Sequence, residues 1–225
     1  FGYFLFGLFW IGEAFLVEAD KFAWLLPFAV TLLPAGLALF FATAAAAAQR
    51  VWTPGLARVV ILALALAVAE WLRGHVLTGL PWNVLGYALT WPLPLMQSAS
   101  VLGIYTLTVL TVIAFAAPLV GLADAAGQAR GKIADARAWA GGALGAAIVV
   151  SLAAYGGVRL AGASDATVPG VKLRIVQPSV PQREKWQQDK QRAIFDTHLD
   201  LSRRSGDGRV DDLAGITPLV WPEAA

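Results

Sequence analysis

One carboxylate, Glu223, closes the stretch Leu-Val-Trp-Pro-Glu at 219–223 and is the first candidate for chemistry in this chain. The apolar residues before it predict a short buried strand, and Pro222, which cannot donate to a sheet ladder, predicts that the strand ends there. An acid at a strand end of an α/β domain is placed to act as a general base if its surroundings raise its pKa or a cation orients it. A solvated acid at the strand end is the alternative interpretation.

A second pair of ionisable residues, Glu70 and Arg73, lies in the stretch Ala-Glu-Trp-Leu-Arg-Gly. Their spacing of three places them on one face of a helix. Charged groups near the end of a membrane helix are functional candidates, with a structural ion pair at the membrane surface as the alternative. The stretch that follows, 74–86, is too apolar for an ordinary exposed loop. We therefore expect Glu70 and Arg73, with Pro81 and Trp82, to shape a re-entrant or interfacial loop at which lipid enters.

Other classes of site have no support in the sequence. The chain has no cysteine, which excludes disulfides, thiolate metal sites and a cysteine nucleophile among these residues. No phosphate-binding glycine loop, metal motif or nucleophile-elbow serine occurs, so we expect neither a cofactor nor a metal. The net charge is only +2, without a basic aromatic patch, and this argues against nucleic acid.

The elements that must position these residues are set by an unusually apolar composition. Of the 225 residues, 58% are hydrophobic and 14% charged, whereas a soluble domain carries about 25% charged residues. The sequence thus predicts a polytopic membrane protein with helices as the spanning elements. Five apolar segments are candidates for these spans, at about 1–17, 22–48, 56–72, 95–122 and 138–160.

Loop charges predict how these spans are oriented. The loops after the second and fourth segments hold five positive residues, and the opposite loops hold only Lys21 and Arg73. Loops rich in Lys and Arg stay in the cytoplasm, so five spans carry the C-terminal segment to the outer side. The five residues counted as cytoplasmic are Arg50, Arg58, Arg130, Lys132 and Arg137.

A change in composition marks a second domain. We expect a helical bundle over 1–160, a linker rich in small residues over 161–170, and part of an α/β domain over 171–225. Residues 171–177 alternate, with Val171, Leu173 and Ile175 on the apolar face, which predicts a half-buried strand. A polar helix over about 186–205 and a strand over 216–221 complete a strand–helix–strand order.

Four stretches together resemble the apolipoprotein N-acyltransferase family. They are Phe-Gly-Tyr-Phe-Leu-Phe-Gly-Leu-Phe-Trp-Ile at 1–11, Glu-Trp-Leu-Arg-Gly-His-Val-Leu-Thr-Gly-Leu-Pro-Trp at 70–82, Arg-Ile-Val-Gln-Pro-Ser-Val-Pro-Gln-Arg-Glu-Lys-Trp at 174–186, and Val-Trp-Pro-Glu at 220–223. Each is modest alone, but their order and spacing are specific, and the resemblance covers essentially the whole chain.

The resemblance implies a membrane helical bundle joined to a periplasmic domain of the carbon–nitrogen hydrolase (nitrilase) type, an αββα sandwich. It implies a Glu–Lys–Cys triad that moves an acyl chain from a phospholipid, through a cysteine thioester, to the N-terminal amine of the diacylglyceryl-cysteine of an apolipoprotein. This is the final step of bacterial lipoprotein maturation, at the inner (plasma) membrane. Carried onto this sequence, the general base is Glu223, while Glu70 and Arg73 receive no triad role.

The family's lysine and cysteine lie beyond the Trp-Pro-Glu strand, so we expect the chain to be a fragment at both ends and inactive as it stands. Two other functions stay open at this point. One is a membrane-anchored amide hydrolase of the nitrilase type, which would use water as acceptor. The other is a non-catalytic membrane scaffold or transporter fragment, which would draw on Glu70 and Arg73 as intramembrane charges.

Overall fold

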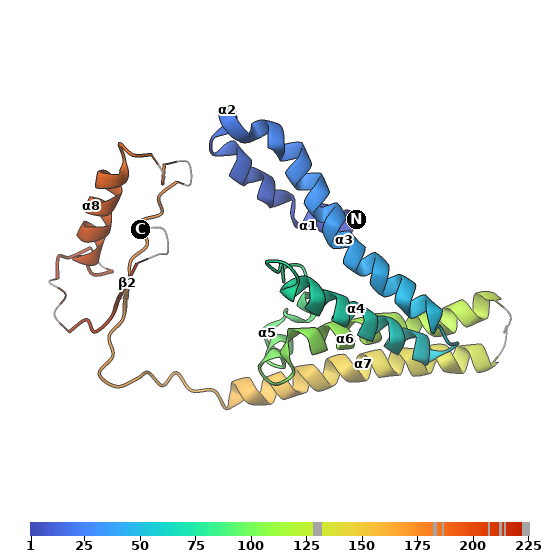
Figure 1. The fold of residues 1–225 in the computed structure, drawn as a ribbon. Helices are drawn as coiled ribbons and strands as arrows, with labels where there is room; N and C mark the ends of the chain where they lie inside the picture. Colours follow the sequence, from blue (N-terminus) through green and yellow to red (C-terminus); the bar gives the residue numbers. More distant parts are fainter. Residues whose placement is uncertain are drawn as a thin grey trace. The chain divides into compact units, whose positions relative to one another are not determined.

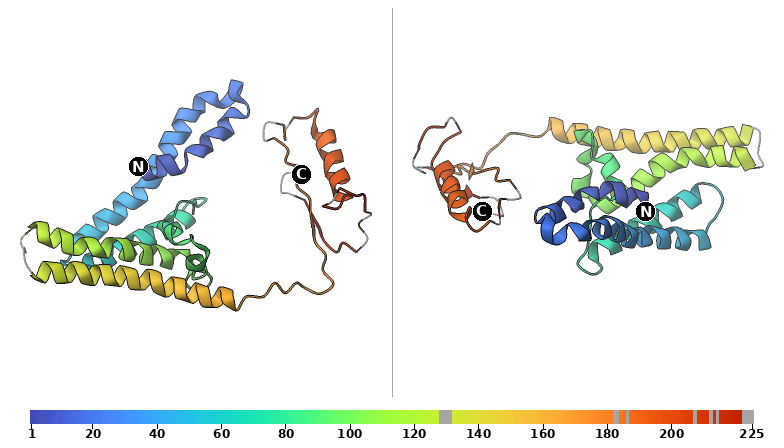
Figure 2. Two further views of the ribbon diagram at one scale, coloured as in Figure 1. Left: turned by 180° about the vertical axis from the view of Figure 1, so that it is seen from behind. Right: turned by 90° about the horizontal axis from the view of Figure 1, so that it is seen from above.

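The structure is a computed structural model that describes residues 1–127, 132–181, 184–185, 187–206, 208–211, 213 and 215–221, with side chains left undescribed over 121–138. The chain divides into two compact units (Figures 1 and 2). The first comprises Phe1–Gly12 and Pro27–Ala163, and the second comprises Glu13–Leu26 and Ser164–Ala225. Each unit is described by itself.

Most of the chain is helical. The long helices are α3 (Leu26–Arg50), α4 (Leu56–His75), α6 (Ala99–Gly127) and α7 (Lys132–Ala161). Short helical elements connect or precede them: α1 (Gly2–Gly7), η1 (Phe9–Leu16), α2 (Ala19–Phe22), η2 (Ala23–Leu25), η3 (Leu85–Leu89) and α5 (Leu93–Met96). The second unit contributes β1 (Arg174–Ile175), α8 (Gln191–Ser202) and β2 (Leu219–Val220).

Three helices of the described chain are long and apolar enough to cross a membrane, over Ala19–Arg50, Ala99–Val120 and Trp139–Ala161. They match the second, fourth and fifth segments expected from sequence. The third expected segment corresponds to α4. This helix is 20 residues long but carries three charged residues, Arg58, Glu70 and Arg73. The first segment differs from expectation, because it is divided into α1 and the 3-10 helix η1.

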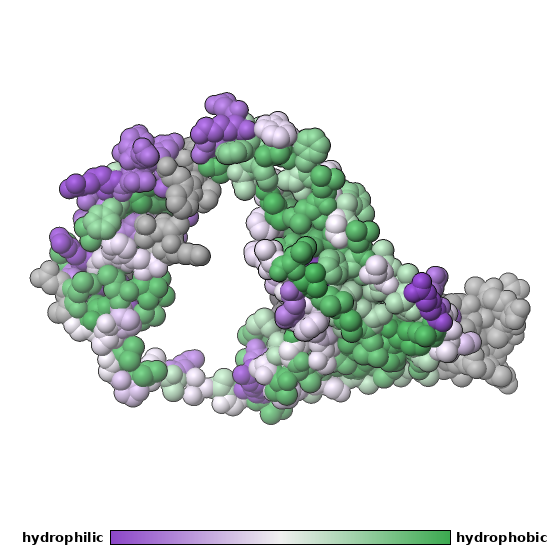
Figure 3. All heavy atoms as spheres, in the orientation of Figure 1, coloured by the Kyte–Doolittle hydropathy of each residue, from purple (hydrophilic) through white to green (hydrophobic). Residues whose placement is uncertain are grey.

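The outer surface of these helices is predominantly hydrophobic (Figure 3). Exposed side chains include Phe115 and Leu119 on α6 and Val150 and Val158 on α7. Apolar residues exposed all along a long helix are typical of a lipid-facing surface. Arg73, which the loop count assigned to an outer loop, is instead buried in α4, and Arg130 lies outside the described residues.

Helices α6 and α7 pack closely because glycines face backbone on the partner helix. A Cβ on Gly145 would collide with the carbonyl oxygen of Ala114, and one on Gly141 with that of Ala117. This Gly-x-x-x-Gly spacing lets two backbones approach, which is how membrane helices associate without a hydrophobic driving force. Leu107 of α6 and Leu152 of α7 are buried in the core that the two helices build.

The second unit holds a parallel pair of two-residue strands, in which Arg174 is opposite Leu219 and Ile175 is opposite Val220. The alternation that we predicted for 171–177 is reversed in burial. Val176 is buried, whereas Leu173 and Ile175 are exposed. The physical reason is that α8 covers the face carrying Arg174 and Val176, since Arg174 Nη1 donates to the Ser202 carbonyl of α8 at 2.8 Å.

The buried residues of α8 are polar. His198 and Ser202, one turn apart, are buried, while Phe195 is about half exposed. Ser202 Oγ donates to the His198 carbonyl oxygen at 2.6 Å and accepts from Trp221 Nε1 at 2.8 Å. A polar contact therefore joins the helix to the end of β2, in place of aliphatic packing.

The glycine packing generates a matched test. We expect Gly145→Val to destabilise the α6–α7 pair by about 1–3 kcal/mol, because the new side chain must push the helices apart. Gly142→Val is the control, since a Cβ at Gly142 meets nothing within 4 Å. Thermal unfolding in detergent measures both variants, and equal melting temperatures would refute the packing.

Candidate functional site

The best-formed polar site in the described chain is built around Arg73, in the last turn of α4. Its side chain is only 2% exposed. Nη1 donates to the carbonyl oxygens of Leu80 at 2.7 Å and Trp82 at 2.6 Å, and Nη2 donates to that of Asn83 at 3.4 Å. The planar guanidinium has five donors in a fixed geometry, so one side chain can hold several carbonyl groups at once.

Glu70, one turn before Arg73, is fully buried and holds the next part of the same loop. Its Oε1 accepts from the backbone N–H of Leu85 at 2.7 Å, and its Oε2 accepts from Thr108 Oγ1 at 2.5 Å. Thr108 Oγ1 in turn accepts from the Gly86 N–H at 3.0 Å. The carboxylate thus ties η3 to α4 directly and to α6 through a hydroxyl group.

Close approach between elements requires glycine at three places around these residues. A Cβ on Gly86 would collide with the Ile104 carbonyl of α6, and one on Gly74 with the Tyr105 hydroxyl. A Cβ on Gly79, at φ +72°, would meet the Gly74 carbonyl. The loop therefore lies directly on α4 and α6, where the two buried charges can reach its backbone.

Aromatic residues from α1 close the site on the remaining side. The Arg73 guanidinium carbon lies 5.0 Å from the centroid of the Phe4 ring, a cation–π distance. Tyr3 donates through its hydroxyl to the Asn83 carbonyl oxygen at 3.0 Å. Arg73 Nε, although buried, has no hydrogen-bond partner among the described residues. The ring face supplies the favourable electrostatic contact on this side.

The structure brings together all four residues that the sequence singled out here, but in unequal roles. Glu70 and Arg73 are buried and bind loop backbone, and the described part of the chain shows no hydrogen bond between their side chains, so the simple ion-pair alternative is not what forms. Pro81 and Trp82 lie on the surface. Trp82 packs against Trp10 with ring centroids 5.1 Å apart. Thr108 was not predicted, because nothing in the sequence distinguishes it from the neighbouring Thr106 and Thr111.

The contacts of this cluster join elements of the fold. Each carboxylate oxygen of Glu70 and each terminal nitrogen of Arg73 has a protein partner. A buried charge is tolerated when it is paired and hydrogen-bonded, and removing one partner is costly. The Glu70–Arg73–Thr108 cluster therefore anchors the segment from Leu77 to Leu89 to the helices.

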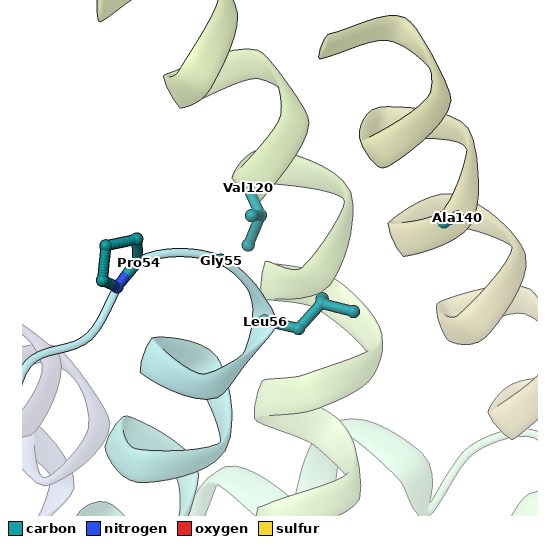
Figure 4. Close-up of a pocket in the computed structure, with 5 residues that line it drawn as sticks. All are labelled: Pro54, Gly55, Leu56, Val120 and Ala140. Carbon is teal, nitrogen blue, oxygen red and sulfur yellow. The ribbon is translucent and has the colours of Figure 1, made fainter. Parts of the chain in front are cut away.

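Two pockets in the described part of the first unit have no ionisable lining residue. A pocket of about 260 Å³ at the opposite end of α4 is lined by Pro54, Gly55, Leu56, Val120 and Ala140 (Figure 4). None of these side chains can donate a proton or act as a nucleophile. Among the described residues there is also no cluster of three metal-ligating side chains.

The histidine that follows the anchor, His75, is exposed, and its Nδ1 lies 2.7 Å from the Trp71 carbonyl oxygen.

The predicted general base, Glu223, lies outside the described residues, as does Pro222. The residue before them is well held. Trp221 donates to Ser202 on α8 and packs edge-to-face on Phe195 with ring centroids 5.8 Å apart. His198 lies 5.1 Å from the Trp221 ring. The chain is thus held against α8 at Trp221, which directly follows β2.

Comparison with known proteins gives the family. The family model for the apolipoprotein N-acyltransferase N-terminal domain matches residues 1–117. The chain belongs to the apolipoprotein N-acyltransferase family. The matched residues include the whole Glu70–Arg73–Thr108 cluster, so this anchor lies within the family's N-terminal domain.

Curated relatives are similar along the entire chain. The apolipoprotein N-acyltransferase of Rhodopseudomonas palustris is 46% identical over 225 residues, that of Bradyrhizobium diazoefficiens 43%, and that of Brucella suis 44% over 234 aligned residues. Each alignment covers 100% of this chain but only 40–41% of the relative. This member of the family thus spans about two fifths of the length of these relatives. No solved structure matches it.

The anchor generates a test with a control on the same helix. We expect Thr108→Val to destabilise the membrane domain by about 1–3 kcal/mol, because a buried carboxylate oxygen loses its donor and the Gly86 N–H its acceptor. Thr106→Val is the control, because Thr106 is exposed on α6. Thermal unfolding in detergent compares the two. Indistinguishable melting temperatures would show that the hydroxyl contributes nothing.

Proposed function

We propose that this chain is part of an enzyme that transfers a fatty acyl group from a phospholipid to the N-terminal amine of the diacylglyceryl-cysteine of an apolipoprotein. The observation that carries the proposal is similarity along the full chain, at 46% identity, to a protein named apolipoprotein N-acyltransferase. The residues agree with that function, since apolar helices precede a strand that runs into Trp-Pro-Glu at 221–223.

In the proposed reaction Glu223 moves the protons. It takes the proton of a cysteine thiol that a longer chain must supply, and the thiolate attacks the ester carbonyl of the phospholipid. The acyl carbon then bonds to sulfur, and the lysophospholipid leaves as an alcohol after receiving that proton. The amine of the acceptor next attacks the thioester, an amide forms, and Glu223 carries the amine proton back to the sulfur.

The proposed domain arrangement follows the same resemblance. Residues 1–160 form the membrane bundle of about five spans, and 161–170 form the linker. Residues 171–225 begin a nitrilase-type αββα sandwich on the periplasmic side of a bacterial inner membrane. The excess of Lys and Arg in the loops assigned to the cytoplasm supports this orientation.

We also propose that the loop around Pro81 and Trp82 shapes the route by which phospholipid reaches the catalytic domain. The anchor on Glu70 and Arg73 supports this role, because a fixed loop keeps its exposed apolar side chains in one place. A membrane domain that binds the phospholipid and the lipid-modified acceptor beside the catalytic site raises their effective concentration there. This is how the membrane domain would contribute to catalysis.

The test extends the chain by fusing residues 1–225 to the C-terminal remainder of the Rhodopseudomonas palustris relative. We expect Glu223→Gln to lower the rate of N-acylation by about 10²–10⁴, which is the typical contribution of a general base. Asp196→Asn is the matched control, because Asp196 is an exposed acid on α8. Mass spectrometry of a lipopeptide acceptor measures the product.

Two results would contradict the proposal. Full activity in the Glu223→Gln fusion would remove the general base. Release of free fatty acid, without any acylated lipopeptide, would make water the acceptor and would favour an amide or ester hydrolase. Unchanged expression of each variant shows that the effect lies in the chemistry.

A further inference from the structure

The segment between α4 and α5 is exposed in part and has no Asp, Glu, Lys or Arg. The chain has no Asp, Glu, Lys or Arg from Gly74 to Ala123. Within residues 76–92 several large apolar side chains nevertheless face outward, with Leu77 97% exposed and Trp91 81% exposed. Trp82 and Tyr87 are also exposed. A surface loop in water normally carries charged side chains, so this composition favours a different surrounding.

The most exposed residue also has an unfavourable backbone conformation. Leu77 has φ +58°, in the left-handed region that a bulky side chain rarely adopts. It lies in a tight turn in which the Gly79 N–H donates to the Val76 carbonyl oxygen at 3.0 Å. Such outliers persist only where surrounding structure enforces them, and they are concentrated at functional sites. If Leu77 lay in water, its backbone would be strained and its side chain fully exposed. No packing within the chain would offset these two costs.

Arg73 holds the turn at its C-terminal end, through two hydrogen bonds to Leu80. The Leu80 N–H donates to the backbone carbonyl oxygen of Arg73 at 2.9 Å, and the Leu80 carbonyl oxygen accepts from the Arg73 guanidinium at 2.7 Å. Because both contacts come from a buried residue at the end of α4, the turn over 76–79 projects from the helix in one fixed orientation. We call the turn over 76–79 the tip.

We propose that the turn over 76–79, led by Leu77 and flanked by Trp82, inserts into the interfacial region of the lipid bilayer. Three observations favour lipid over a protein partner. The tip directly follows α4, whose exposed residues Leu64, Val68 and Leu72 are apolar. The segment carries aromatic residues of the kind enriched at membrane interfaces. It also lacks any charge that could pair with a complementary protein surface. The inference does not depend on the proposed acyl transfer.

The absence of cysteine from the chain makes a direct test simple. Leu77→Cys is labelled with the environment-sensitive fluorophore NBD and reconstituted in phosphatidylcholine vesicles. We expect the label to be quenched by phosphatidylcholine spin-labelled at acyl carbon 5 and to be at least threefold less sensitive to aqueous iodide than a label at Arg192→Cys. Arg192, on α8, is the control because its side chain is 91% exposed and charged.

Val76→Cys is a second probe of the same turn, because Val76 is also exposed. It should give the same quenching pattern, so the result does not depend on one variant folding. Circular dichroism of each labelled protein verifies its helix content. Iodide quenching at both positions equal to that at residue 192 would overturn the proposal. Protection from iodide without any quenching by spin-labelled lipid would overturn it as well, since a protein surface would then cover the tip.

Discussion

The contact on which the rest of the first unit depends is that between the buried Arg73 guanidinium and the carbonyl groups of the loop that follows α4. Removing a charge from water is expensive, and three carbonyl oxygens and the Phe4 ring compensate for it here. Because these partners come from α1 and from the loop after α4, the arginine has all of them only when the elements lie in this arrangement.

Two kinds of contact hold the elements of the first unit together: close backbone packing and hydrogen bonds from buried polar side chains. Where α6 meets α7, Gly141 and Gly145 let the backbones touch, and the contact needs no polar group. Where η3 meets α4 and α6, loop N–H and C=O groups are buried, and Glu70, Arg73 and Thr108 bind them. Backbone groups that are buried away from water need such partners, and in this irregular segment side chains supply them. Regular helices meet the same requirement through their own hydrogen bonds.

Sequence patterns predicted the long helices well, because apolar runs such as 22–48 and 138–160 have few alternatives in a membrane. They also singled out Glu70 and Arg73 as candidates, since ionisable residues stand out in an apolar chain, but not the loop carbonyl and N–H groups that these side chains bind. They did not identify Thr108 as the partner of Glu70, because that contact joins residues 38 positions apart and depends on how α4 and α6 pack. In the second unit the sequence predicted the wrong buried face for β1. Alternating apolar and polar residues define two faces of a strand, but they do not say which face α8 covers.

The parallel pairing of β1 with β2 has a consequence for the order in which the chain acquires its structure. The two strands are joined through the 43 residues that separate Ile175 from Leu219, and a parallel pair cannot close through a short turn. During synthesis, β1 therefore leaves the ribosome long before its neighbour exists, whereas α6 and α7 are adjacent in the chain and can associate as soon as both have been made. The membrane hairpin can form co-translationally, but the sheet must wait for Leu219 and Val220, and until then the backbone of β1 is open to pairing with a wrong strand.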